Sequence, residues 1–586
     1  MRGTIRFAEG RNQESRRTRF QLTRLVLRSI AVIIFFSAVT GFCGNPSHET
    51  VKSDESYLFP TDASHRINSG FADYRANHFH GGIDISTNGK IGYPVYAAKS
   101  GYVYRVSVSP FGYGKRIILR HNDSTFTLYG HLSAFTGESQ RLVESEQQTE
   151  GKYDVDMTFS PNAIRVTRGE MIARTGATGD GGPHLHFEVH DSDYSFVDPL
   201  TFRSLDVTRY MRPRIFNVAV RGFESGRARV CGVMRRGNVY RARETFRMTE
   251  PFFFIVHAAD SYGRGRFKRP PKRIELKIDG KGFISVNLTK FRAADYLDVA
   301  SLVDLHLSHS YKTYYKLCVD RAIPFTVFTP SSPLSGLVHG NLPDGKHTYE
   351  ITVKDEDDNS SSVTGRFILE LNKSKEKQGP PEIQPFAGKD VSPMPGVTLH
   401  FPADAFVENV DLEVRKVSES AFVMESEGKP LRRKVLLTWK IDDPKLQLFR
   451  RGRHGWIHEP CRNDGHVLTA RIGYETGEFA LIRDDVPPSV GIIRVSKKNP
   501  FYRSVAPTEF RRYFVYFKVF DNLSNVDTDD IFLRAGTQKF LCEYDVDKRA
   551  VVCNVDAALL RREKYVEILV RDNAGNRRTV KSRLRF

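Results

Sequence analysis

The segment from His184 to His190 constrains the fold more than any other stretch, because polar and apolar side chains alternate strictly along it. His184, His186, Glu188 and His190 are spaced two residues apart, and Leu185, Phe187 and Val189 lie between them. On a β-strand, residues i and i+2 point to the same face. The segment therefore predicts a half-buried strand, with its apolar face in a core and its polar face lining a cleft.

A second histidine motif, Asn77–Asp84, lies about a hundred residues upstream of this strand. Its His80 and Asp84 are four residues apart, and the two glycines between them disfavour a helix. An even spacing on a strand places both side chains on one face. The motif therefore predicts a histidine and a carboxylate that point in the same direction.

A third histidine, His131, ends another predicted strand. The turn residues Asn122–Ser124 precede this strand, and Arg116–Arg120 before them is also strand-like. Simple alternation puts Thr125, Thr127, Tyr129 and His131 on one face, opposite Phe126 and Leu128. We therefore expect a hairpin that carries His131 toward the other two motifs.

These residue types favour a catalytic zinc site. Zinc needs neutral imidazole nitrogen and carboxylate oxygen, and a catalytic site keeps one coordination position open. His80, Asp84 and one histidine of the His184/His186 pair meet this need, and zinc would lower the pKa of water from about 16 to about 7. The two remaining histidines could transfer protons or stabilise an oxyanion, because the pKa of imidazole lies near neutral pH.

The alternative interpretation is that these histidines are unrelated surface residues. The chain has 18 histidines, so an isolated pair with this spacing carries little weight. The glycine-rich turn at Thr175–Pro183 favours the functional interpretation, because such loops often approach a ligand closely. Another metal fold, such as a cupin, would need a third ligand a few residues beyond the pair and a second motif downstream, and Glu188 lies only two residues beyond His186.

The stretch from Ala72 to Leu200, about a fifth of the chain, resembles the lysostaphin-type (LytM-like) zinc endopeptidases of bacterial cell walls. The matching segments occur in the family's order: His78–Asp84, Gly92–Ala98, Gly101–Val103, Phe111–Gly114, Tyr129–Leu132, Val166–Glu170 and Thr175–Glu188. The resemblance implies an antiparallel β-sheet peptidase that cuts amide bonds in the peptide part of peptidoglycan. It assigns His80, Asp84 and His186 as zinc ligands and His131 and His184 as catalytic histidines.

Several neighbours of these motifs are further candidates. Tyr74, Arg75 and His78 could contact substrate or support the ligands, and Glu188 could orient a ligand histidine or pair with a basic side chain. His190 replaces a basic residue common in the family, and we expect it to be a solvated residue at the strand end. The polar run from 138 to 152 predicts a loop over or beside the cleft.

The N-terminal region predicts export. Residues 1–28 hold eight arginines and two acids, and Ile30–Phe42 is apolar for 13 residues. That length suits a signal peptide better than a membrane span, although an uncleaved anchor in the membrane stays open for residues 1–44. The 88 basic and 69 acidic residues give a formal charge of +19. Without a nucleic-acid motif, we expect no nucleic-acid partner, and the charge suits the anions of the cell envelope.

The rest of the chain predicts further β-domains. The peptidase domain would span 45–205, immunoglobulin-like β-sandwiches 206–371 and 485–586, a linker 372–385, and a β-rich domain of unclear type 386–484. A weak repeat relates Gly345–Asp355, followed by Asn359, to Glu563–Asp572, followed by Asn576; Phe252–Asp260 likewise resembles Tyr513–Asp521. The acidic turn residues of this repeat could bind calcium, although simple turn chemistry explains them as well.

The fold class is thus mostly β. A turn at Asp547-Lys548 would set Cys542 opposite Cys553, so an oxidising envelope would allow a cross-strand disulfide. The leading functional hypothesis is an exported zinc endopeptidase acting on peptidoglycan cross-links or stems, whose sandwiches position the enzyme or bind envelope proteins. The rival hypothesis is a non-catalytic or autoinhibited wall-binding or activator protein on the same fold.

Overall fold

The structure is a computed structural model. It describes these residues: 56–75, 78–161, 163–205, 207, 211–261, 269–309, 312–320, 325–371, 386–406, 410–426, 429, 431–453, 455–473, 475–497 and 512–584. The predicted signal or anchor segment, 1–44, and the predicted linker, 372–385, lie outside the described residues. Within them, no helix combines the length and the apolarity that crossing a bilayer requires.

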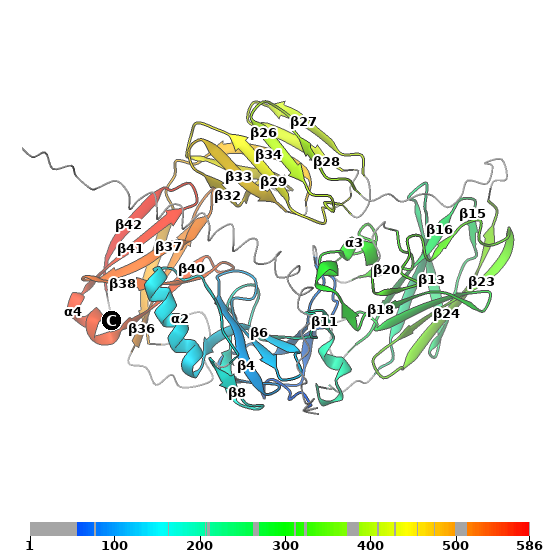
Figure 1. Ribbon diagram of the computed structural model, residues 1–586, viewed down its shortest axis with the longest axis horizontal. Helices are drawn as coiled ribbons and strands as arrows, with labels where there is room; N and C mark the ends of the chain where they lie inside the picture. The colour runs from blue at the N-terminus through cyan, green and yellow to red at the C-terminus, as the bar shows by residue number, and fades with distance from the viewer. Residues whose placement is uncertain are drawn as a thin grey trace, which may run out of the picture. The chain divides into compact units, whose positions relative to one another are not determined.

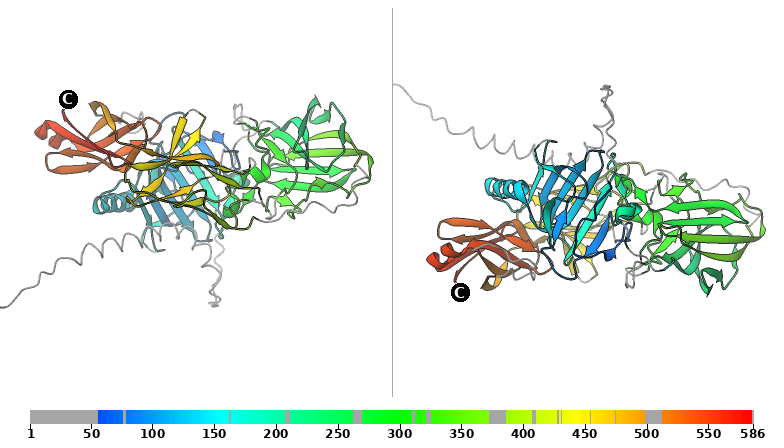
Figure 2. Two further views of the ribbon diagram at one scale, coloured as in Figure 1. Left: turned by 90° about the horizontal axis from the view of Figure 1, so that it is seen from above. Right: turned by 90° about the horizontal axis from the view of Figure 1, so that it is seen from below.

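Antiparallel β-sheets dominate the described chain, which confirms the predicted fold class. Strands that are close in sequence group into successive sheets, as the colours in Figure 1 and the two further views in Figure 2 show. The predicted domain boundaries stay predictions, as does the immunoglobulin-like type of the sandwiches.

The first sheet holds all three histidine motifs. Its strands follow the order β1 (Ile67–Ser69), β2 (Ile83–Ser86), β10 (His184–His190), β6 (Phe126–Phe135), β5 (Lys115–His121), β4 (Gly101–Val108) and β7 (Val155–Thr158). Five short strands join it at the margins: β3 (Pro94–Tyr96), β8 (Arg165–Val166), β9 (Met171–Thr175), β11 (Phe196–Val197) and β19 (Lys290–Phe291). Strand β10 lies between β2 and β6, so the segment from 184 to 190 is central.

The two faces of β10 are as the alternation predicts. Leu185, Phe187 and Val189 are almost completely buried in one core with residues of β2, β4, β5 and β6. The opposite face carries His186 and Glu188. Burial of three apolar side chains on one face fixes the register, because a slip by one residue would move them all to the other face.

The polar run after β6 is a helix and not the loop predicted from sequence. Helix α2 (Gly137–Glu150) lies beside β4, β6 and β7 (Figure 1). Its glutamates and glutamines are good helix formers, and it ends where Gly151 adopts a left-handed conformation (φ 66°). Only Ser139 and Val143 of this helix are buried, so it has too narrow an apolar stripe to be recognised by periodicity.

The second sheet follows directly. It consists of β12 (Arg214–Gly222), β13 (Ala228–Arg236), β14 (Val239–Ala242), β15 (Phe246–Met248), β16 (Phe252–Ala259), β17 (Arg273–Ile278), β18 (Lys281–Asn287), β20 (Tyr314–Lys316), β21 (Phe328–Thr329), β22 (Leu337–Val338), β23 (Gly345–Lys354) and β24 (Ser360–Leu369). Short helical turns accompany these two sheets at η1 (Pro199–Thr201), η2 (Arg203–Leu205), η3 (Ala293–Asp295) and α3 (Val299–Leu302). The hydrophobic core of the second sheet also includes Phe71, Phe79 and Phe196, which come from the region of the first sheet. In addition, β11 pairs with β19.

The remaining strands form two pairs of sheets. Residues 389–483 make two five-stranded sheets over one core: β25 (Lys389–Val391), β26 (Val397–Phe401), β29 (Val435–Lys440), β33 (Val467–Ile472) and β32 (Cys461–Asn463), with β27 (Glu413–Ser418), β28 (Ala421–Glu425), β34 (Gly477–Arg483), β30 (Leu446–Gly452) and β31 (Gly455–Glu459). The segment of unclear type is therefore a sandwich.

The last pair of sheets has four strands each. They are β35 (Ser489–Ser496), β36 (Arg512–Phe520), β40 (Ala550–Asp556) and β39 (Glu543–Asp545), with β38 (Gln538–Leu541), β37 (Val526–Ala535), β41 (Tyr565–Asp572) and β42 (Arg577–Arg583); helix α4 (Ala557–Glu563) joins β40 to β41. Cys542 and Cys553 form the expected disulfide, because β39 and β40 pair around the turn at 546–549.

Truncating Phe187 to alanine should destabilise the first sheet by about 3–5 kcal/mol, because the ring is completely buried beneath β10. Denaturant unfolding followed by circular dichroism measures this loss. The matched control is Phe111→Ala, since that ring is 52% exposed; it should cost less than about 0.5 kcal/mol. Equal losses in the two variants would contradict the described packing.

Candidate metal site

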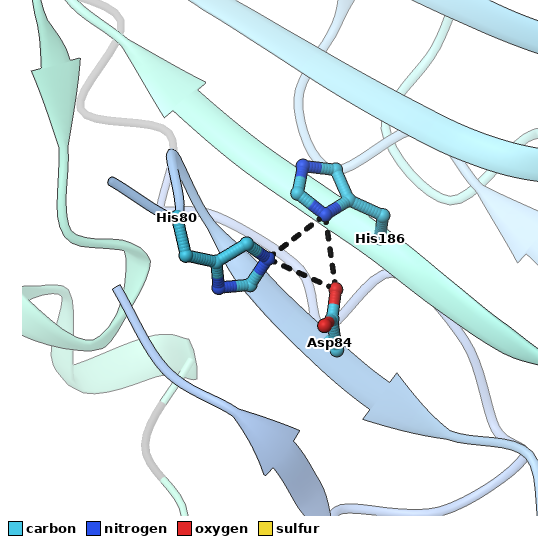
Figure 3. Close-up of side chains that lie close together, drawn as sticks. All are labelled: His80, Asp84 and His186. Carbon is cyan, nitrogen blue, oxygen red and sulfur yellow. Dashed lines mark hydrogen bonds and ion pairs between the residues drawn. The ribbon is translucent and has the colours of Figure 1, made fainter. Parts of the chain in front are cut away.

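Three side chains from two of the histidine motifs converge on one point (Figure 3). The Nε2 atom of His80 lies 3.0 Å from Oδ1 of Asp84 and 3.1 Å from Nδ1 of His186. The distance from His186 Nδ1 to Asp84 Oδ1 is 3.0 Å. All three residues are buried, and the arrangement could hold a metal ion.

Strand pairing brings these residues together. In the antiparallel register of β2 and β10, Asp84 lies directly opposite His186, and His80 stands just before β2. Gly82 allows this approach, because a Cβ there would lie 2.1 Å from the carbonyl oxygen of Phe187. Gly82 therefore serves close packing of two backbones, beyond merely disfavouring a helix.

Outer hydrogen bonds orient both rings. His80 Nδ1 donates to the carbonyl oxygen of Gly70 at 2.6 Å, which leaves Nε2 as the lone-pair atom at the centre. His186 Nε2 donates to Glu188 Oε1 at 2.8 Å, which leaves Nδ1 at the centre. Arg75 donates to the second oxygen of Asp84, Oδ2, at 3.1 Å. The structure therefore places Glu188 and Arg75 against the three-residue cluster.

Glu188 belongs to a buried network of hydrogen bonds that the sequence predicted only in part. Its Oε1 accepts from the Tyr113 hydroxyl at 2.7 Å, and its Oε2 accepts from His190 Nε2 at 2.8 Å. His190 is only 1% exposed, so the expectation of a solvated strand-end residue was wrong. We expected a polar residue at the end of a strand to face water. Instead, the ring of Tyr194, in the turn that follows, stacks on the ring of His190 and covers it.

His131 and His184 lie beside the cluster, with ring centroids 4.4 Å apart. His131 Nδ1 donates to the carbonyl oxygen of Thr178 at 2.9 Å, and His184 Nδ1 donates to that of Gly182 at 2.7 Å. Nε2 is therefore the basic atom of each ring. His184 Nε2 lies 3.5 Å from Asp84 Oδ1, so all five family positions occupy one site.

His131 does not share a strand face with Tyr129, so the prediction from simple alternation was wrong. Tyr129 is completely buried in the core, so plain alternation would send His131 into that core as well. The pairing of β5 with β6 instead skips a residue, so that Gly130 and His131 lie opposite Arg116 alone. At this bulge His131 adopts a left-handed backbone (φ 58°), which redirects its ring to the site.

Burial and neighbouring charges set the protonation of the site. Burial raises the pKa of the Asp84 carboxyl, but His80, His184 and His186 outweigh it and hold that pKa well below its usual range. Burial lowers the pKa of His131 to about 3, and His184 and His186 reinforce the shift. Burial also opposes protonation of His186, yet bonds to Asp84 and Glu188 raise its pKa to about 9.

Two of the remaining candidates lie at the margin. The ring of His78 lies 5.1 Å from that of Tyr296, and Tyr74 packs against the core of the second sheet. Neither belongs to the three-residue cluster. Tyr113 is the residue that sequence reasoning missed; its signal was its place in the Phe111–Gly114 segment, two residues before the strand that precedes β6.

Comparisons with known proteins agree with this geometry. The profile described as Peptidase family M23 matches residues 78–149. An uncharacterized metalloprotease of Haemophilus influenzae is 32% identical over 152 residues, covering 25% of this chain and 26% of that protein. Lipoprotein NlpD of Yersinia enterocolitica is 30% identical over 114 residues, covering 20% of this chain and 93% of that one. Murein hydrolase activator NlpD of Escherichia coli (strain K12) is 31% identical over 121 residues, covering 21% and 25%.

A buried His/Asp/His cluster flanked by two further histidines on an antiparallel sheet is a site of the metallopeptidase class. The chain belongs to peptidase family M23. It spans about a quarter of the length of the Haemophilus and Escherichia relatives, so the likeness concerns this one region.

Replacing Gly82 by alanine should disrupt the site by pushing β2 away from β10. The added Cβ would meet a backbone oxygen, which cannot move as a side-chain end can, so we expect a loss of about 1–3 kcal/mol or more. Thermal unfolding measures the loss. The matched control is Gly182→Ala, where no atom lies within 4 Å of the added Cβ; it should unfold at the parental temperature. A parental midpoint for Gly82→Ala would contradict the described register.

Proposed function

We propose that this protein is a zinc-dependent endopeptidase that hydrolyses amide bonds in the peptide cross-links or stems of bacterial peptidoglycan. The observation that carries the proposal is the convergence of His80 Nε2, Asp84 Oδ1 and His186 Nδ1 within 3.1 Å of one another, beside His131 and His184. Family membership supports it, and the family model covers His80, Asp84 and His131 of the five residues.

The three donors fit zinc. Bonds of about 2.0–2.2 Å in a tetrahedron separate ligand atoms by about 3.3–3.5 Å, slightly more than the 3.0–3.1 Å seen between these donors. The donors are two imidazole nitrogens in the required tautomer and one carboxylate oxygen, without thiolate, and this set suits zinc. His80, Asp84 and His186 would hold the ion, and a fourth position would face His131 and His184.

When bound, zinc would polarise the substrate carbonyl and lower the pKa of water. The chain's own residues do the rest. His131 is neutral because its pKa is about 3, and its Nδ1 proton is committed to the Thr178 carbonyl. Its Nε2 is therefore free to receive a proton during attack and return it to the leaving amine. His184 offers a second Nε2 beside it, for the developing oxyanion or the same proton.

Arg75 and Glu188 act as positioning residues in this account. Arg75 occupies the outer oxygen of Asp84, which keeps Oδ1 directed at the centre. Glu188 holds His186 and is fixed in turn by Tyr113 and His190. Such outer partners set the tautomer and the basicity of a ligand histidine. Substrate contact by Tyr74 and His78 stays a prediction.

The chain would act in the cell envelope. Its relatives include lipoproteins by name, and its predicted N-terminal segment would export it to the periplasm or, if uncleaved, anchor it in the membrane. The charge of +19 suits an anionic wall. The β-sandwiches would position the enzyme or bind envelope proteins.

A second candidate is a non-catalytic or autoinhibited activator on the same fold. The observation that favours it is the name of the Escherichia coli relative, a murein hydrolase activator. The two candidates differ in the chemistry they require, because an activator needs no proton-transfer histidines. Activity of the purified chain on peptidoglycan separates them.

His131→Ala should lower the cleavage rate by about 10²–10⁴, because the variant lacks the proton acceptor. The assay incubates residues 45–586, loaded with zinc, with purified peptidoglycan and identifies new amine and carboxyl ends by mass spectrometry. The matched control is His65→Ala, an exposed histidine in the same region that should retain parental activity. If the zinc-loaded parent cleaves no bond in peptidoglycan, that result would contradict the proposal of an enzyme and favour an activator.

Zinc affinity should rise with pH up to about 9. His186 is protonated below its pKa of about 9 in the metal-free chain, and zinc must displace that proton. The apparent affinity should therefore fall about tenfold for each pH unit below 9, as competition with a chromophoric chelator would measure. Glu188→Gln removes one carboxylate that raises this pKa, so the zinc affinity of the variant should stop rising at a lower pH than that of the parent. Identical profiles for parent and variant would contradict the role given to Glu188.

A further inference from the structure

A cluster of acidic side chains, separate from the histidine site, lies at the start of the last pair of sheets. Asp484 follows β34, Asp521 follows β36, and Asp572 ends β41. One carboxylate oxygen from each lies within 4.8 Å of the others. Asp484 is 1% exposed and Asp572 0%, so two of the three carboxylates are out of water.

Among the described residues, the hydrogen bonds to these carboxylates come from neutral donors. Asp572 accepts from the backbone nitrogen of Asn576 at 2.8 Å and from its amide Nδ2 at 2.9 Å. Asp484 accepts from the backbone nitrogens of Val486 and Ser524, each at 3.1 Å. Asp521 Oδ2 accepts from the backbone nitrogen of Leu523 at 3.1 Å. These bonds fix the geometry and neutralise no charge.

Within the residues that the structure describes, no lysine or arginine forms an ion pair with any of the three. Two basic side chains of this region bond to other partners: Lys445 donates to the amide oxygen of Asn576, and Arg571 pairs with Asp527 and Asp530. Adjacent buried carboxylates without a counter-charge are costly. Burial, together with the neighbouring carboxylates, accordingly raises the pKa of both Asp521 and Asp572.

Two buried oxygens of this region have no hydrogen-bond partner among the residues that the structure describes. They are Oδ1 of Asp521 and the hydroxyl oxygen of Ser524, whose residue is 0% exposed. The backbone nitrogen of Ser524 donates to Asp484, and the hydroxyl is three covalent bonds from that nitrogen, so the hydroxyl lies in the neighbourhood of the Asp484 carboxylate. Buried oxygens that lack a hydrogen-bond donor and lie near carboxylates are atoms that could coordinate a cation.

The internal repeat supplies a comparison within the same chain. In the second sheet, Asp355 accepts from the backbone nitrogen and Nδ2 of Asn359 at 2.9 and 3.0 Å, which reproduces the geometry of Asp572 and Asn576. Asp260, the counterpart of Asp521, pairs with the buried guanidinium of Arg269 at 2.8 Å. One copy of the repeat thus encloses an ion-paired arginine, whereas in the other copy no described lysine or arginine forms an ion pair with the three carboxylates.

We propose that Asp484, Asp521 and Asp572, with the hydroxyl of Ser524, bind a calcium ion. The donors are all oxygen, which selects a hard cation over zinc. Calcium tolerates an irregular set of carboxylates and a neutral oxygen, whereas magnesium demands a near-ideal octahedron. Because Asp484 directly follows β34, the ion would tie the end of that strand to β36 and β41 of the last pair of sheets.

Equilibrium dialysis with radioactive calcium tests this proposal on the full chain, stripped of metal and then loaded with zinc. We expect one calcium ion per parent chain at or below about 1 mM free calcium, the range of extracellular calcium modules. Asp521→Asn should weaken binding at least about tenfold, because a charged ligand is lost. Calcium should also raise the unfolding temperature of the parent and leave that of the variant unchanged.

Two controls make the result specific. Asp527→Asn removes a carboxylate of the same region that faces Arg571, and it should bind calcium as the parent does. Asp84→Asn should also retain calcium, which separates this cluster from the histidine site. If circular dichroism shows that Asp521→Asn does not fold, Asp484→Asn takes its place, and the parent's response to calcium is decisive by itself.

A parent chain that binds no calcium at about 1 mM, or whose unfolding temperature ignores it, overturns the proposal. Equal affinity in Asp521→Asn and the parent overturns the assignment of the ligands. Binding of magnesium in place of calcium overturns the choice of ion. None of these outcomes depends on whether the chain cleaves peptidoglycan.

Discussion

The antiparallel pairing of β2 with β10 is the interaction on which the candidate site depends. It sets Asp84 opposite His186 and brings the turn that carries His80 over the same point. A slip of one residue would turn His186 into the core and Phe187 out of it. Three apolar residues of β10 in the core and the close backbone contact at Gly82 oppose that slip. The proposed chemistry therefore rests on apolar packing on the far side of the same strand.

The sequence predicted what strict alternation can determine, and it failed where the backbone departs from alternation. The faces of β10 follow from a period of two residues. The convergence of the His80 and His186 motifs was predicted from the chemistry of zinc ligands and from the family resemblance, since His80 itself lies before β2. The position of His131 does not, because a bulge with a left-handed residue redirects it, and period counting carries no signal for a bulge. The burial of His190 and the role of Tyr113 arise from contacts distant in sequence, which one strand cannot reveal. Helix α2 was missed because its apolar stripe is too narrow.

The histidine site, the Asp260–Arg269 pair and the Asp484, Asp521 and Asp572 cluster accommodate buried charge in three different ways. At the histidine site, Asp84 is surrounded by imidazoles and an arginine. In one copy of the repeat, Asp260 is matched by a buried arginine. In the other copy, no described lysine or arginine forms an ion pair with the three carboxylates, and the proposed calcium ion would balance their charge. Position in a repeat therefore predicts backbone geometry better than it predicts the chemistry of a turn.

The most direct test of the central claim is zinc K-edge X-ray absorption of the full chain loaded with one equivalent of zinc. The account predicts a first shell of nitrogen and oxygen only, at about 2.0–2.2 Å, with the imidazole outer-shell signal of two histidines. In His186→Ala that imidazole signal should fall by half or the zinc should be lost. A sulfur shell at about 2.3 Å, or a spectrum unchanged in His186→Ala, would contradict it, since the metal would then lie at a cysteine or elsewhere on the chain.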